Sequence, residues 1–276
     1  MTRNLKLIMA LAMISCAVQA QPFLLKSTSG AKPFQLNIYY GTGGKGAYVQ
    51  YRGQQGVIPL RLKKQPVQDK TSKLKVTYIW DEVVEGKVTG TYKLSQQTNQ
   101  ISAASYSRNK DHKLFMLEQE KDEEDYSGKV SYLLHGVIIS FSRGMDEQLT
   151  FGYPDKIKKI AHLPGFDSQD PQRKGTIDDY NFDGYDDVAF SIPDAGMGVY
   201  RTFTIYLYNP VSKRFELLAE PDAPKAKCSG FCDVTLDKKN KLLLTACRGG
   251  ANWWNNVYKY TAHNHLTWLS AKKAEN

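Results

Sequence analysis

Apolar and polar residues alternate along much of this chain, with the period of two that is typical of half-buried β-strands. The segments 34–39 and 73–78 show this pattern most clearly. Glu85 and Gly86 separate two further β-rich stretches, which indicates a hairpin. Additional strands are expected at 78–84, 88–94, 101–107 and 113–117. The pattern therefore predicts an antiparallel β meander over residues 34–119.

The second half of the chain has strand patterns as well, and no convincing amphipathic helix. Residues 203–208 form a long apolar run that ends at Asn209 and Pro210, and 214–218 should pair back against it across a turn at 211–213. Other strands are expected at 130–141, 188–192, 257–260 and 266–269. We therefore predict an all-β fold.

A run of charged residues over 118–125 gives the clearest domain boundary, because such a run cannot enter a core. It separates an N-terminal β domain at 21–120 from a C-terminal β domain at 121–276. The glycine-rich stretch 41–46 resembles a phosphate loop, but no helix follows whose N-terminus could hold a phosphate. We interpret it as a turn between strands.

The first twenty residues have the features of a secretory signal peptide. Arg3 and Lys6 are followed by a largely apolar stretch, and Val18-Gln19-Ala20 suits signal-peptide cleavage. A lipid anchor at Cys16 is less favoured because the usual leucine three residues earlier is missing. No later stretch is apolar enough to span a bilayer, so a periplasmic or secreted protein is expected. The net charge of +9 suits an acidic partner or an anionic envelope surface. Scattered lysines and export argue against nucleic acid.

Residues 179–187, DYNFDGYDD, place side-chain oxygens at every second position and a glycine at the turn. A hard cation such as Ca²⁺ needs six to eight oxygen ligands, and a tight loop can supply them from alternate residues. Glycine permits the backbone conformation that such a turn requires. The expected ligands are the side chains of Asp179, Asn181, Asp183 and Asp187 and the carbonyl oxygen of Tyr185.

The spacing does not suit an EF-hand, because position twelve is Phe190 rather than glutamate and a β-rich run follows. A D-x-N-x-D-G-x-x-D loop that leads into a strand resembles the calcium loops in the propeller blades of integrin α chains and related bacterial repeats. This resemblance implies a structural Ca²⁺ ion.

Three cysteines remain after removal of the signal peptide, in a compartment that permits disulfides. If Lys239 and Asn240 form a two-residue turn, Cys232 lies opposite Cys247 in a hairpin. We therefore prefer a Cys232–Cys247 disulfide, while Cys228–Cys232 and Cys228–Cys247 remain alternatives.

We find no convincing catalytic set, and hence predict a non-enzyme with no catalytic residues. The five histidines are scattered, and neither a G-x-S-x-G elbow nor an H-E-x-x-H helix is present. The stretch 248–256 contains Arg248, Trp253 and Trp254 in a Gly- and Asn-rich context. Tryptophan and arginine dominate interface energies, and tryptophan also stacks on sugars, so these three are candidate partner-binding residues.

The calcium loop, the strand after it, the YLYNP motif at 206–210 with Phe215, and Arg248-Gly249-Gly250 together resemble a group of exported bacterial proteins. This group includes the immunity proteins of bacterium-killing type IV secretion systems, which inhibit lysozyme-like peptidoglycan hydrolases. The resemblance covers residues 150–270 and implies a propeller-like, calcium-bound C-terminal domain. Residues 34–117 resemble the N-terminal β domain of some relatives more weakly.

The resemblance implies a function in the cell envelope. We expect an immunity or inhibitor protein whose partner is a secreted or periplasmic cell-wall hydrolase. The alternative is an envelope- or carbohydrate-binding module that binds peptidoglycan without inhibiting an enzyme.

Overall fold

The computed structural model of the chain describes residues 22–30, 32–69, 72, 74–120, 128–166, 173–194, 200–249, 252–261 and 264–274. Within these residues the fold is all-β, as expected, with a single turn of 3₁₀-helix, η1 (Thr42–Gly44). The proposed signal peptide lies outside the described residues. Among those that are described, no helix has the length and apolar character needed to cross a membrane.

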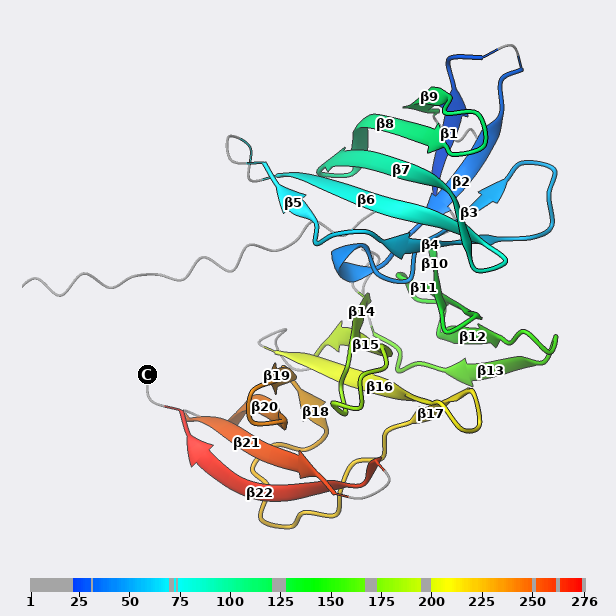
Figure 1. Cartoon of the computed structure of the whole chain (residues 1–276). Coiled ribbons are helices and arrows are strands. Elements are labelled where there is room, and N and C mark those ends of the chain that lie inside the picture. The colour runs from blue at the N-terminus through cyan, green and yellow to red at the C-terminus, as the bar shows by residue number, and fades with distance from the viewer. Residues whose placement is uncertain are drawn as a thin grey trace, which may run out of the picture.

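The N-terminal part is a closed antiparallel barrel of eight strands, drawn at the top of Figure 1. Its strands are β1 (Phe23–Ser27), β2 (Gln35–Tyr39), β3 (Tyr48–Tyr51), β4 (Ile58–Leu62), β6 (Lys75–Val84), β7 (Lys87–Gln97), β8 (Gln100–Arg108) and β9 (Leu114–Gln119). Strand β1 pairs with β9, and pairing of β4 with β6 closes the ring. The short β5 (Val67–Gln68) pairs with β6 beside the barrel. The predicted hairpin at Glu85-Gly86 is confirmed, with Val84 opposite Lys87.

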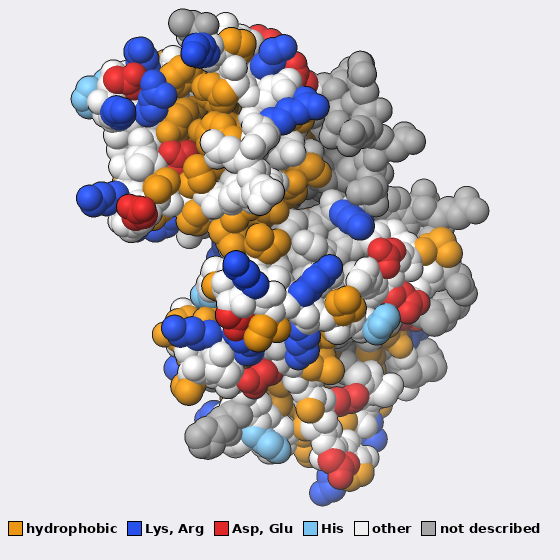
Figure 2. Space-filling view, turned by 90° about the vertical axis from the view of Figure 1, so that its right-hand side faces the viewer, with side chains coloured by type: hydrophobic (Ala, Val, Ile, Leu, Met, Phe, Trp, Pro, Cys, Tyr) orange, Lys and Arg blue, Asp and Glu red, His pale blue; other side chains and the backbone are white. Residues whose placement is uncertain are grey.

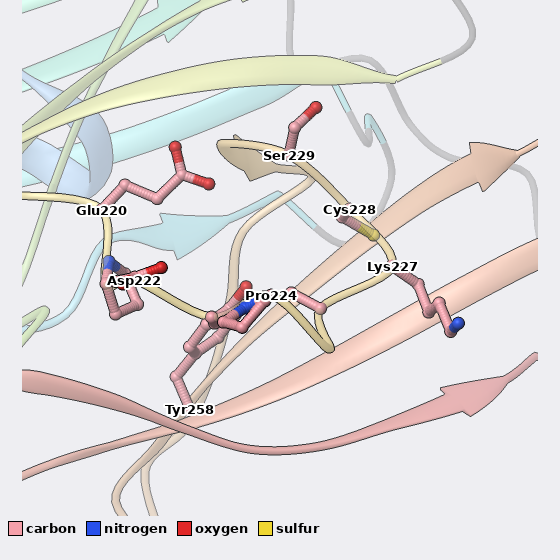
Figure 3. A pocket seen from close by; sticks show the side chains of 10 residues that line it. Glu220, Asp222, Pro224, Lys227, Cys228, Ser229 and Tyr258 are labelled. Carbon is pink, nitrogen blue, oxygen red and sulfur yellow. The ribbon is translucent and has the colours of Figure 1, made fainter.

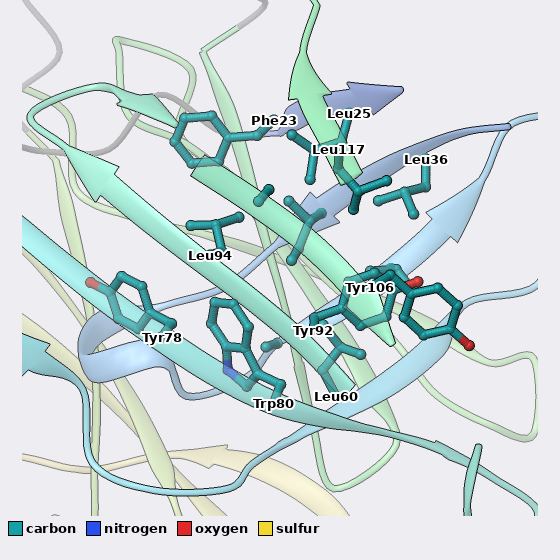
Figure 4. Packing of buried hydrophobic residues seen from close by; sticks show 14 of the residues in the cluster. Phe23, Leu25, Leu36, Leu60, Tyr78, Trp80, Tyr92, Leu94, Tyr106 and Leu117 are labelled. Carbon is teal, nitrogen blue, oxygen red and sulfur yellow. The ribbon is translucent and has the colours of Figure 1, made fainter. Parts of the chain in front are cut away.

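Alternate side chains of the barrel strands point inward and fill its interior, which explains the period of two in the sequence. Aromatic and aliphatic side chains share this core (Figure 4), and the wholly buried Trp80 contacts the rings of both Tyr78 and Tyr40. The indole Nε1 of Trp80 donates a hydrogen bond of 2.8 Å to the carbonyl oxygen of Gly44, which ties η1 to the barrel.

The C-terminal part contains three consecutive antiparallel sheets. The first comprises β10 (Lys129–Leu134), β11 (Val137–Ser142), β12 (Gln148–Gly152) and β13 (Lys158–His162). The second comprises β14 (Lys174–Asp178), β15 (Asp187–Pro193), β16 (Arg201–Asn209), β17 (Arg214–Leu217) and β18 (Phe231–Cys232). The third comprises β19 (Thr235–Asp237), β20 (Leu242–Gly249), β21 (Asn252–Tyr260) and β22 (Leu266–Lys273).

These sheets confirm the C-terminal part as β structure, although a propeller is not established. The predicted pairing of 214–218 with 203–208 is correct, with Tyr208 opposite Phe215. Side chains from the first two sheets form one shared core, and those from the second and third form another. The second sheet therefore lies between the other two, as Figure 1 also shows.

Candidate metal centre

The predicted calcium loop joins β14 to β15, the two adjacent strands that pair at Asp178 and Asp187. Its backbone reverses through two left-handed residues, Phe182 with φ of 62° and Gly184 with φ of 93°. Glycine adopts this conformation without steric cost, and the phenylalanine is a strained exception. The glycine that the sequence singled out therefore occupies the turn for the expected reason.

The carboxylates of this loop accept hydrogen bonds from its own backbone. Asp179 accepts from the amides of Asp183 and Gly184, at 3.0 and 2.9 Å. Asp183 accepts from the amide of Tyr185 at 2.9 Å and from the side-chain amide of Asn181 at 2.8 Å. These bonds hold the carboxylates of Asp179 and Asp183 against the backbone of the turn.

Asp187 is the buried carboxylate of the loop, with no exposed surface. Its two oxygens accept hydrogen bonds from the amides of Tyr180 and Tyr208, at 2.8 and 2.7 Å. Burial raises the pKa of Asp187 to about 7, those two bonds oppose the rise, and the nearby Asp183 and Asp179 carboxylates add to it. A buried carboxylate with like charges beside it is an environment that a bound cation would relieve.

The chemistry of these side chains fits a hard cation, since all the expected ligands are oxygens and three are carboxylates. Among the described residues, no group of three or more acidic, histidine or cysteine side chains is gathered as a metal-binding cluster. The carboxylate oxygens of Asp179 and Asp183 accept hydrogen bonds from backbone amides of the loop. Calcium binding therefore remains a proposal, with Asp179, Asn181, Asp183, Tyr185 and Asp187 as the residues that would hold the ion.

The loop also connects separate parts of the molecule. The Lys45 ammonium group lies 2.6 Å from Asp186 and 4.0 Å from Asp178, and so links the barrel to the second sheet. The His135 ring from the first sheet contacts the Asp186 carbonyl oxygen at 2.7 Å. On the other side, the Asn181 amide donates to Asn264, between β21 and β22, at 2.7 Å. The loop thus contacts the barrel and both neighbouring sheets.

The glycine-rich stretch 41–46 is part of this junction, a role that its sequence pattern did not reveal. Gly41 and Gly46 lie against Ile177 and Tyr132, and a Cβ atom on Gly41 would come within 2.3 Å of the Ile177 side chain. The amide of Leu133 donates to the Gly46 carbonyl oxygen at 2.9 Å. Glycine is needed here because the barrel backbone approaches the C-terminal sheets closely.

The disulfide differs from the preferred pairing, because Cys228 is bonded to Cys247 and Cys232 is a free, buried thiol. The hairpin register behind the preferred pairing is correct where β19 pairs with β20, since Leu236 lies opposite Leu243. However, β19 begins only at Thr235, and the chain before it turns away through the left-handed Asp233. Cys232 consequently pairs with Thr202 of β16 instead of facing Cys247.

Trp253 and Trp254 lie in β21, opposite Arg248 and Cys247 of β20. Both tryptophans are half-buried, and the Lys227 ammonium group lies 5.5 Å from the centre of a Trp254 ring. Tyr260, which contacts Phe182 of the calcium loop, lies six residues beyond Trp254 along β21. At about 3.3 Å per residue, the tryptophans are roughly 20 Å away from that contact. The structure therefore separates the two groups of predicted site residues.

An open hollow of about 440 Å³ lies beside the disulfide, between Glu220, Lys227, Ser229 and Tyr258. Figure 3 shows Glu220 and Lys227 on opposite sides of it, with the Lys227 ammonium group directed outward. Glu220 accepts a hydrogen bond from the amide of Gly230. The hollow therefore presents isolated polar groups rather than a convergent set.

Comparison with known proteins adds no family assignment: no family model matches the sequence, and a search of curated proteins gives no significant match.

Proposed function

We propose that this chain is an exported calcium-binding protein that binds and inhibits a peptidoglycan hydrolase in the periplasm. The observation that carries the proposal is the position of the 179–187 loop. It contacts the barrel through Lys45 and the third sheet through Asn264. An ion held in this loop would fix these parts together as one body.

A rigid body suits an inhibitor, because little conformational entropy is lost when it docks into an enzyme cleft. The three C-terminal sheets are proposed to act as a propeller-like unit in which the cation has a structural role. Loss of Arg3 and Lys6 with the signal peptide would lower the net charge from +9 to +7, and this positive mature charge would favour encounter with an acidic enzyme surface, an effect that weakens with added salt.

Isothermal titration of Ca²⁺ into chelator-treated protein tests the metal. We expect one binding event and a higher melting temperature with Ca²⁺, since a ligand that binds only the folded state stabilises it. Asp183→Ala removes a proposed ligand and should weaken binding strongly. Asp186→Ala is the matched control, because it removes the same charge from the same loop without removing a ligand. Absence of both heat and thermal shift would refute calcium binding.

The inhibitory activity is tested by capturing secreted and periplasmic proteins of the source organism on the full chain, followed by a peptidoglycan-lysis assay. We expect a captured hydrolase whose lytic activity falls when the protein is in excess. Undiminished lysis, with no hydrolase captured, would rule out inhibition.

The alternative, an envelope-binding module, predicts retention on insoluble peptidoglycan without any enzyme. The half-buried state of Trp253 and Trp254 gives this alternative less support, because a sugar needs an open ring face.

The same two tryptophans can be tested as contacts for a captured hydrolase. If Trp253→Ala and Trp254→Ala bind the hydrolase as tightly as the wild type, these residues do not anchor it.

A further inference from the structure

Strand β13 is the last strand of the first sheet, and within the described residues it pairs only with β12. Hydrogen bonds from Tyr153 to Ile157 and from Leu163 to Glu147 bracket this pairing. Hydrogen-bonded pairs alternate along an antiparallel ladder, so the backbone groups of Lys159 and Ala161 face β12. Those of the residues between and beside them, Lys158, Ile160 and His162, face away from the sheet. The edge thus offers a row of donors and acceptors for another strand.

The side chains on this edge combine charge with apolar surface. Lys158 and Lys159 are exposed, and Ile157 and Ile160 have 54% and 51% of their surface exposed. Lysine on an edge strand commonly prevents unwanted pairing between copies of a protein. Exposed isoleucine side chains favour such pairing instead. Protection against pairing therefore does not explain why Ile157 and Ile160 are exposed beside the lysines.

The charge around the start of this edge is predominantly positive, whereas the exposed Glu147 lies at its far end, beside Leu163. Lys156 precedes β13, and Lys213 lies in the neighbouring turn between β16 and β17. The one carboxylate in the β12–β13 turn, Asp155, is engaged by Arg214. Figure 2 faces the side of the molecule on which β12 and β13 lie in Figure 1, and lysine and arginine side chains stand out across the middle of it.

We propose that the β13 edge binds an extended, acidic segment of a partner protein, which adds to the first sheet as a fifth strand. Main-chain hydrogen bonds would supply affinity, while carboxylates near Lys158 and Lys159 would select the partner and Ile160 would contact an apolar side chain. This inference rests on the proposed function only for the identity of the partner, which would then be the hydrolase.

Proline at position 160 tests the main-chain bonds directly. The Ile160 amide faces outward, so Ile160→Pro removes an edge donor and leaves the β12–β13 ladder intact. Ile160→Ala is the matched control, because it removes the apolar side chain and keeps the donor. Lys158→Glu with Lys159→Glu forms a second, charge-reversed variant on exposed side chains that should not disturb folding.

The probe is a synthetic ten-residue peptide that repeats Glu-Glu-Val-Val, so that each face of the extended peptide alternates glutamate with valine as the faces of β13 require, and a Lys-Lys-Val-Val peptide is its opposite. Fluorescence anisotropy measures binding to the full chain, and hydrogen exchange reports the amides of residues 158, 160 and 162. We expect the acidic peptide to bind and to protect these amides. Ile160→Pro should bind at least tenfold more weakly than Ile160→Ala, and the charge-reversed variant should prefer the lysine peptide.

Three results would overturn the edge assignment: no binding of the acidic peptide, binding without protection of these amides, or equal binding by the proline and alanine variants. The charge-reversed variant remains decisive if Ile160→Pro fails to fold. The two proposals can also fail separately. If a hydrolase is captured equally well by the wild type and both edge variants, the hydrolase is not the partner of the edge and inhibition stands. If the acidic peptide binds as expected but no hydrolase is inhibited, the edge stands and the proposed function fails.

Discussion

The barrel and the C-terminal sheets reach stability in different ways. The barrel strands form a continuous ring of hydrogen-bonded neighbours around one core. The C-terminal sheets instead have outer strands such as β13 and β22, and separate cores lie between them. A disulfide and the contact of the 179–187 loop with Asn264 add further links within these sheets. The closed barrel is therefore stabilised mainly by packing around one core, whereas the open C-terminal sheets are also stabilised by local cross-links.

The two parts also accommodate a buried carboxylate differently. In the barrel, Glu82 accepts hydrogen bonds from the side chains of Thr89, Tyr92 and Tyr106. Burial raises the pKa of the Tyr106 hydroxyl, and contact with Glu82 raises it further. In the second sheet, Asp187 accepts from backbone amides. A side-chain network such as that of Glu82 depends on the barrel's packing, whereas Asp187 joins the backbone of its own loop at Tyr180 to the backbone of β16 at Tyr208.

The largest effect should come from opening the barrel core. Trp80→Ala removes a fully buried ring, and we expect a loss of about 3–5 kcal/mol in the free energy of unfolding. Urea unfolding followed by circular dichroism measures it. Trp80→Phe keeps a ring but loses the bond to Gly44, so it should cost clearly less. A similar stability for Trp80→Ala and the wild type would contradict a barrel held by its packed core.

Loss of the disulfide should have the next largest effect. The bond joins residues 19 positions apart, so Cys228→Ser should cost about 3 kcal/mol by raising the entropy of the unfolded chain. Cys232→Ser is the control, because it leaves that bond intact. Chemical denaturation under non-reducing conditions gives both values. A larger loss for the control, together with a Cys232–Cys247 peptide in a digest, would reverse the assignment.

Cys232 itself should react slowly in the folded protein. Burial raises the pKa of its thiol to about 11, and the nearby Asp233, Glu220 and Asp194 carboxylates add to the rise. The thiolate is the reactive form, so at pH 8 its fraction is about a hundredfold lower than at the ordinary pKa near 9. Iodoacetamide labelling, measured by mass spectrometry, should therefore be slow until urea is added. Rapid labelling of the folded chain at pH 8 would show that the thiol is accessible and ionised.

Strands and hairpins that local sequence pattern determines were predictable from the sequence. Alternation gave the barrel strands, and the Glu85-Gly86 and 211–213 turns gave correct hairpins. Contacts between segments that are far apart in the sequence were not predictable in this way. Hairpin register alone places Cys232 opposite Cys247, but in the structure Cys232 pairs with Thr202 of β16. This pairing joins segments far apart in the sequence, so local pattern does not reveal it. The junction at Gly41 and Gly46 was missed for the same reason, because Ile177 and Tyr132 belong to strands far away in sequence.

The smallest effect concerns the junction between the two parts. Lys45 and Asp186 are both about one-third exposed, so their ion pair should contribute at most about 1 kcal/mol, and less in high salt. A double-mutant cycle of Lys45→Ala and Asp186→Ala measures this coupling without the costs of each substitution alone. Gly41→Ala should cost more, because its Cβ would meet Ile177 at 2.3 Å and Tyr132 at 3.2 Å. This order would mean that close packing, rather than charge, holds the barrel on the C-terminal sheets. A coupling above about 2 kcal/mol, or a harmless Gly41→Ala, would assign that role to the ion pair instead.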